Sequence, residues 1–210
     1  FVDAFRTTVE PEGLDSEDEV LLHRAYHLER TAQVLRMTDV MIFTLGLTET
    51  WEDRATGRVF PVCPGVAGGT FDPAAHQFRN LRHAEVLADL HAIRALLHRF
   101  RPGMKMLLTV SPVPLTATAS GDHVMTATAR SKAVLRAAVG EFVDDVADAD
   151  YFPSFEIVTQ PASGGPWFEP DMRAVSPAGV AKVMGIFLAA QGLAPTAPRS
   201  APGAPDDDEG

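Results

Sequence analysis

Polar side chains that can bind a ligand or move a proton follow two apolar runs of this chain. Gly46, Thr48 and Glu49 come directly after residues 40–45 (VMIFTL), and Ser111 ends the next run (KMLLTVS). A glycine lets a ligand approach the backbone closely, while hydroxyl and carboxylate groups donate or accept hydrogen bonds. We therefore predict that these four residues line a binding site.

A histidine and an aspartate elsewhere in the chain are the candidates for proton transfer. His123 lies in a predicted loop, and Asp171 precedes the last predicted helix, where it can orient a histidine. Asp171 can equally be a surface carboxylate or pair with Arg173. Five other histidines fall on predicted helix faces without the glutamate of an HExxH zinc motif, so we expect no metal site; they are His23, His27, His83, His91 and His98.

Each of the four ligand-binding candidates also has a structural interpretation. The segment from Gly46 to Trp51 can be a tight turn with a helix cap. Ser111 lacks a surrounding Gly-x-Ser-x-Gly sequence, so as a nucleophile it is disfavoured against a structural serine at a strand end. Cys63 has no activating base near it in the sequence and is expected to be inert.

The elements that position these residues alternate regularly along the chain. Apolar positions three and four apart predict helices, and unbroken apolar runs predict strands buried on both faces. This order is typical of a mostly parallel, doubly wound α/β sheet, which binds ligands at the carboxyl ends of its strands. The predicted strands are 40–45, 105–111 and 151–158; the loops are 46–79, 112–123 and 159–175; the helices carry apolar stripes at 21–35, 86–100, 135–146 and 180–188, with Ser16 and Ser176 as N-caps.

Composition excludes several classes of protein and partner. The 210 residues carry a formal charge of −10, which argues against a nucleic-acid partner. One cysteine excludes an internal disulfide framework, and no apolar run approaches the about 18 residues of a membrane span. We expect one domain over residues 1–192, a disordered acidic tail over 193–210, no cofactor, no membrane partner and a cytoplasmic location.

Several sequence blocks follow one another over about residues 1–190: FVDAFRTTVEPEG, DVMIFTLGLTETW, VFPVCPG with GTFD, LLTVSPVPLTAT, HVMTATARSKAVLRAA, YFPSFEIV and DMRAVSPAGVAKVM. In this order they resemble the GSCFA family, which is related to the SGNH-type hydrolases. The resemblance implies a flavodoxin-like three-layer α/β/α sandwich and a serine esterase or acyl hydrolase that acts on O-acylated substrates such as acylated carbohydrate.

The sequence departs from the family pattern at the catalytic positions. It contains no Gly-Ser-Cys-Phe-Ala segment, so the resemblance places the nucleophilic serine and the first strand upstream of Phe1. Asp171 matches the aspartate of the Asp-x-x-His motif, but Ala174 stands at the histidine position. Thr48 and Glu49 replace the Asn-Asp pair that follows the glycine, which leaves the oxyanion donor unassigned.

Three functions remain open from the sequence. For an esterase we predict that His123 replaces the missing base and is oriented by Asp171 or Glu49. The alternatives are an O-acyltransferase, and a catalytically inactive module that binds a glycan or a protein through loop 46–79. Because one inner strand is expected to be missing, we predict that these 210 residues alone are unstable and inactive.

Overall fold

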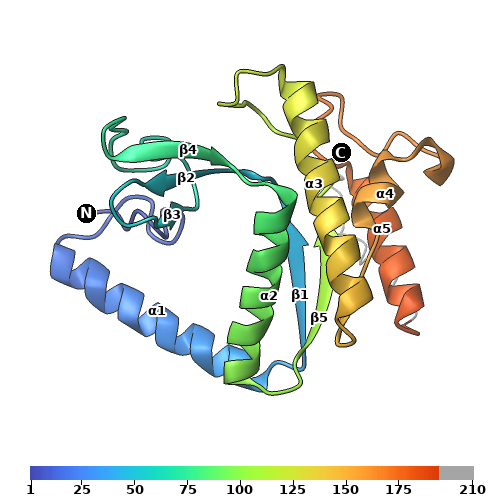
Figure 1. Cartoon of the computed structure of the whole chain (residues 1–210), viewed down its shortest axis with the longest axis horizontal. Helices are drawn as coiled ribbons and strands as arrows, with labels where there is room; N and C mark the ends of the chain where they lie inside the picture. The colour runs from blue at the N-terminus through green and yellow to red at the C-terminus, as the bar shows by residue number, and fades with distance from the viewer. Residues whose placement is uncertain (194–210) are drawn as a thin grey trace, which may run out of the picture.

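Two small sheets and five α-helices make up residues 1–193, the part of the chain that the computed structural model describes (Figure 1). The elements are α1 (Glu17–Met37), β1 (Val40–Leu45), β2 (Glu49–Asp53), β3 (Val59–Phe60), β4 (His76–Asn80), α2 (His83–Phe100), β5 (Lys105–Val110), α3 (Val124–Asp145), β6 (Ala149–Tyr151), α4 (Ser154–Thr159), the 3-10 turn η1 (Pro161–Ser163) and α5 (Pro177–Ala190).

The main sheet is parallel and has the strand order β1-β5-β6. Helices α2 and α3 connect its strands and pack side by side on one face (Figure 1). The Thr109 side chain points to the other face, where its hydroxyl hydrogen bonds Ser154 of α4. Helices therefore cover both faces, as in the α/β sandwich that the sequence predicts.

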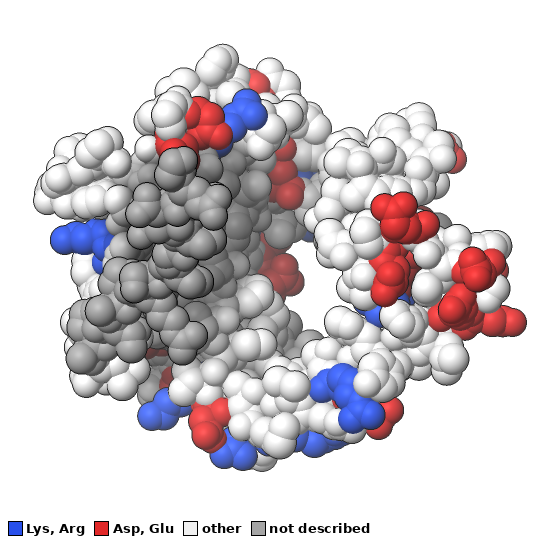
Figure 2. Space-filling model, turned by 180° about the vertical axis from the view of Figure 1, so that it is seen from behind, with Lys and Arg blue, Asp and Glu red and all other residues white. Residues whose placement is uncertain are grey.

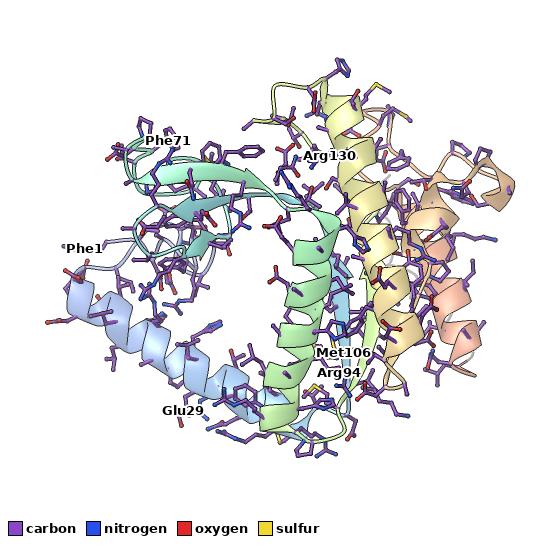
Figure 3. All side chains as sticks on the ribbon, viewed as in Figure 1. Phe1, Glu29, Phe71, Arg94, Met106 and Arg130 are labelled. Atoms are coloured by element: carbon purple, nitrogen blue, oxygen red, sulfur yellow. The ribbon has the colours of Figure 1, made fainter. Side chains whose placement is uncertain are left out.

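The core lies between β5 and the two helices α2 and α3. Met106, Leu108 and Val110 alternate along β5 and point toward these helices, and each is 2% exposed or less. Phe142 of α3 is fully buried against the same cluster. Figure 3 shows Met106 deep between the helices, near the amino end of β5 and opposite the end that carries the candidate residues.

The predicted loop 46–79 is wrong, because it contains the antiparallel sheet β3-β2-β4. Strand β2 has the sequence ETWED and β4 has HQFRN, so neither shows an apolar alternation. Aromatic contacts hold this sheet instead: the Trp51 ring lies edge-on to Phe71 and Phe78, with centroid distances of 5.1 and 5.6 Å.

The predicted third strand, 151–158, is also wrong beyond its first residue. The strand β6 ends at Tyr151, and Pro153 is the N-cap residue of the short helix α4. The proline cannot continue a ladder of backbone hydrogen bonds. The Ser154 hydroxyl donates to the carbonyl oxygen of Val110 at 2.9 Å and so fixes the start of α4 at the end of β5.

The predicted burial of the first helix and first strand is only partly correct. Ser16 caps α1 as expected, with its hydroxyl accepting from the Glu19 N–H at 3.1 Å. Leu28 on the predicted apolar face of α1 is nevertheless 58% exposed, whereas Val20 near the start of the helix is buried, and the carboxyl end of α1 meets α2 (Figure 1). In β1 one face is open, with Val40 and Ile42 about half exposed, so this strand is not buried on both faces.

Charge on the surface is mixed. On the described part of the face in Figure 2, basic side chains are interspersed with acidic ones rather than gathered into a stripe. None of the helices within residues 1–193 is both long and apolar enough to cross a membrane. The predicted disordered tail, apart from Leu193, lies outside the described residues.

Candidate functional site

The carboxyl ends of β1 and β5 bring Gly46 and Ser111 together. The two residues follow the paired residues Leu45 and Val110, and the Ser111 N–H donates to the Leu45 carbonyl oxygen at 2.8 Å. A Cβ atom placed on Gly46 would meet no atom within 4 Å, so open space borders the backbone here. A ligand can therefore approach this backbone, as the sequence predicts for a glycine at a strand end.

Thr48 points into the protein rather than into open space. Its side chain is fully buried, its N–H donates to the Ser131 hydroxyl at 2.7 Å, and its own hydroxyl donates to the Asn80 side-chain oxygen at 2.7 Å. These hydrogen bonds connect the segment after β1 to β4 and to α3. Because both donors of Thr48 are used, the residue offers no free donor to an oxyanion. Ser131 and Asn80 were not among the sequence-predicted residues.

Glu49, the first residue of β2, connects that strand to the loop that precedes His123. Its carboxylate accepts from the Thr118 hydroxyl and from the Ala119 N–H, the latter at 3.3 Å. The side chain thereby fixes loop residues 118 and 119, which lie far from it in sequence. Glu49 is thus a positioning residue for this loop in the structure.

Ser111 and His123 each make a local hydrogen bond. The Ser111 hydroxyl accepts from the Val113 N–H at 3.2 Å. His123 is exposed and is the N-cap of α3, with Nδ1 accepting from the Met125 N–H at 3.3 Å. This bond makes Nδ1 the acceptor, so the neutral imidazole carries its proton on Nε2.

The Asp171 carboxylate stabilises the turn in which the residue itself lies. Its Oδ1 accepts from the backbone N–H groups of Arg173 and Ala174 at 2.8 and 3.1 Å, and these bonds lower the pKa of the carboxyl group. The next residue, Met172, has a φ of +57°, in the left-handed region. Within residues 1–193 no hydrogen bond joins Asp171 or Glu49 to His123, so that pairing stays a prediction.

Lys132 is a third residue of this region that the sequence patterns did not identify. It is 3% exposed, its Nζ donates to the Gly46 carbonyl oxygen at 2.8 Å, and burial lowers the pKa of its ammonium group to about 8. Its spacing to Leu135, Val139 and Phe142 places it on the buried face of α3. That spacing is a signal that could have identified it. In Figure 3 the Arg130 label marks this part of α3.

A cavity of about 1220 Å³ opens beside these residues. It runs along α3 and is bordered by the loop after β5, by α4 and by the segment around Asp171. Its wall is mostly apolar, as in many small-molecule sites. The lining residues include Leu115, Phe155, Phe168, Met125, Met172 and Lys132.

Within the described part of the chain, no group of three or more metal-ligating side chains gathers. Cys63 is partly buried, which raises the pKa of its thiol and disfavours the reactive thiolate. The arrangement therefore offers a backbone approach at Gly46, a loop histidine, a tethered carboxylate and a buried ammonium beside an apolar cavity. These groups suit the binding and polarisation of a carbonyl compound.

Comparison with known proteins gives a family and a distant structural likeness. The sequence model of the GSCFA family matches residues 3–187. A solved structure from Streptococcus pneumonia, provisionally described as a platelet activating factor, aligns with a TM-score of 0.38 and 14% identity over 84% of this chain and 99% of that chain. No curated protein matches this chain.

Proposed function

This chain belongs to the GSCFA family, and from that premise we propose that it forms the ester-binding part of a serine esterase or acyl hydrolase. The observation that carries the proposal is the meeting of Gly46, Ser111, Lys132 and the Glu49-tethered loop at one edge of a parallel sheet, beside the cavity. Sheets of this type bind their ligands at this edge. The substrates we propose are O-acylated compounds, including acylated carbohydrate.

In the proposed reaction, a serine attacks the ester carbonyl carbon and forms an acyl-enzyme, which water then hydrolyses. The sequence contains no Gly-Ser-Cys-Phe-Ala segment, and we assign the attacking serine to that family segment. His123 would take the serine proton at Nδ1, giving up its hydrogen bond from the Met125 N–H, and return the proton to the leaving alcohol. Glu49 would act through the loop, by holding residues 118 and 119 and so the approach to His123.

The experiment uses a chain that carries the family segment together with residues 1–210, and measures hydrolysis of p-nitrophenyl acyl esters. His123→Asn keeps an N-cap acceptor for the Met125 N–H but removes the imidazole. We expect kcat to fall about 100-fold or more, the usual contribution of a general base. The matched control is His27→Ala, because His27 is exposed on α1. Unchanged turnover in His123→Asn removes the histidine from the mechanism.

A second function, an inactive module that binds a glycan or a protein, is favoured by one feature. Ala174 stands where the family motif has a histidine, and Asp171 uses its carboxylate on its own turn. A serine-directed phosphonate separates the two functions. Covalent labelling of the family serine supports the enzyme, whereas absent labelling together with absent ester turnover supports the binding module.

An acyltransferase would form the same acyl-enzyme as the hydrolase. It would differ only in the acceptor of the acyl group, which would be a sugar hydroxyl instead of water. The same assay run with added sugar alcohols distinguishes this case. Faster release of p-nitrophenol together with an acylated sugar product supports the transferase. Release of free acid alone, unaffected by the sugar, supports the hydrolase.

A further inference from the structure

Lys132 is a buried ammonium group without an acidic partner among residues 1–193. It is 3% exposed, and its one hydrogen bond there goes to the neutral carbonyl oxygen of Gly46. An ammonium group has three N–H donors, so two remain for another acceptor. A buried charge that lacks a counter-charge is costly, and a protein that retains one gains by binding an anion there.

Lys132 is also a lining residue of the large cavity, so its side chain borders a space that a ligand can enter. It is the one charged residue of the cavity wall, within the described residues, that is buried. The other charged residues of the wall are exposed or already have partners: Arg136 pairs with Glu156 at 2.8 Å, Glu141 lies 3.3 Å from His83, Asp171 accepts from its own turn, and Asp144 and Arg173 are exposed.

Most of the remaining wall is apolar. Leu115, Phe155 and Phe168 contribute aliphatic and aromatic surface, and Met125 and Met172 flank it with 74% and 66% of their surface exposed. Exposed methionine side chains adapt readily to apolar ligands of different shape. The cavity therefore combines one buried positive charge without an acidic partner among the described residues with a mostly apolar wall.

We propose that this cavity binds an apolar monocarboxylate, whose carboxylate lies on Lys132 and whose hydrocarbon chain lies along α3. Charge complementarity selects the carboxylate, and the apolar wall selects the chain. The site needs no nucleophile, so it does not depend on the proposed esterase activity. If the esterase proposal also holds, the ligand has the chemistry of the acid that ester hydrolysis releases.

Calorimetric titration of the full-length protein with decanoate and with decanol, both below the concentrations at which they form micelles, tests the proposal. We expect decanoate to bind at least about tenfold more tightly than decanol, because only the carboxylate forms charge-assisted hydrogen bonds. Equal affinity for the two ligands overturns the proposal, and so does the absence of saturable decanoate binding. This comparison uses the unaltered protein and does not depend on the folding of any variant.

Lys132→Met then assigns the preference to this residue. Methionine has a similar length and no charge, so the apolar cavity is kept. We expect the preference for decanoate over decanol to fall by about tenfold while decanol affinity stays within about twofold. Lys182→Met, on the exposed surface of α5, is the matched control and should keep the preference. A retained preference in Lys132→Met, or its loss in Lys182→Met, contradicts the assignment.

Discussion

The two sheets of this molecule are held together in different ways. Around β5 the apolar side chains are completely enclosed, and Leu108, Val110, Val139 and Phe142 have no exposed surface. In the antiparallel sheet, Glu52 is the one buried residue of β2, β3 and β4. The main sheet therefore depends on close packing, and the antiparallel sheet on contacts between half-exposed aromatic and charged groups.

This difference implies different sensitivities. Close packing is damaged by any loss of volume and hardly responds to salt or pH. Contacts between partly exposed charged groups weaken with salt and with protonation of their carboxylates. Variants in the two regions should therefore differ both in how much they lower the free energy of unfolding and in how that change depends on pH.

The largest effect is expected from Phe142→Ala in α3. The ring is fully buried in the core, so its removal should lower the free energy of unfolding by about 3–5 kcal/mol. Phe78→Ala, at a half-buried ring of β4, should cost about 1–2 kcal/mol. Urea unfolding followed by circular dichroism measures both. Equal losses would contradict the contrast between the two regions.

Asp3→Asn should have the next largest effect. The Asp3 carboxylate is buried and pairs with Arg24 of α1 and with Arg6, the latter at 2.8 Å. The hydrogen bond from Arg24 is the main reason that the pKa of Asp3 lies well below its ordinary value. We expect a loss of about 2–3 kcal/mol at pH 7, because Arg24 is partly exposed and its pairing partly screened.

The pH dependence of Asp3 follows from the direction of its shift. A lowered native pKa means that the stabilisation is fully present above the unfolded value of about 3.9 and is lost as pH falls toward the native value. The difference between wild type and Asp3→Asn should therefore shrink below about pH 4. Urea unfolding at a series of pH values measures it. A constant difference down to pH 2 would show that the ion pairs do not stabilise the fold.

Lys132 is the exception within the densely packed region, and its effect should be smaller and opposite in sign. Its pKa is lowered from 10.5 to about 8, so the native state releases a proton before the unfolded state does. Stability should then rise as pH increases from about 8 to 10.5. At pH 7 we expect Lys132→Met to be about 1–2 kcal/mol more stable than wild type.

Chemical unfolding of wild type and Lys132→Met between pH 7 and pH 10.5 checks this. The stability advantage of the variant should diminish over that interval, because wild type loses its buried charge. Lys182→Met should follow wild type throughout. An advantage that grows with pH would show that the ammonium group stabilises the fold.

The smallest effect is expected from Arg79→Ala in the antiparallel sheet. Arg79 bonds the Glu52 carboxylate at 3.0 Å, but its side chain is 41% exposed and Gln77 also bonds Glu52. We expect a loss of about 0.5–1 kcal/mol, reduced further in 1 M salt. Thermal unfolding at low and high salt measures it. A loss comparable to that of Phe142→Ala would contradict the difference between the sheets.

The parts of the fold that apolar patterns encode could be predicted from the sequence. The strand β5 is a mostly apolar run with apolar helices on either side in the chain; it lies where it was predicted, over Lys105–Val110, and from Met106 onward its residues are buried except for the half-buried Leu107. In β2 and β4 the cross-strand pairs are aromatic and charged, such as Trp51 with Phe78, and these leave no period in the sequence. The burial of β1 could not be predicted because it depends on neighbours rather than on its own residues.

The candidate site, like the fold, could be predicted only where a local sequence pattern encodes it. The predicted meeting of Gly46 and Ser111 follows from the rule that parallel strands end at one edge. The enclosure of Thr48 by Ser131 and Asn80 depends on side chains 83 and 32 positions away, which local sequence does not bring together. Lys132 was overlooked because a lysine within an amphipathic helix is usually exposed.

The position of β1 at one edge of the main sheet has a consequence for the rates at which its amides exchange hydrogen with water. Within residues 1–193, β1 pairs with β5 alone, and the carbonyl groups of Asp39 and Leu45 point toward β5. Backbone groups alternate in direction along a strand, so the N–H groups of Ile42 and Thr44 point away from β5. Their deuterium uptake should be fast, and that of the intervening Phe43 slow, which gives this strand an alternating exchange pattern.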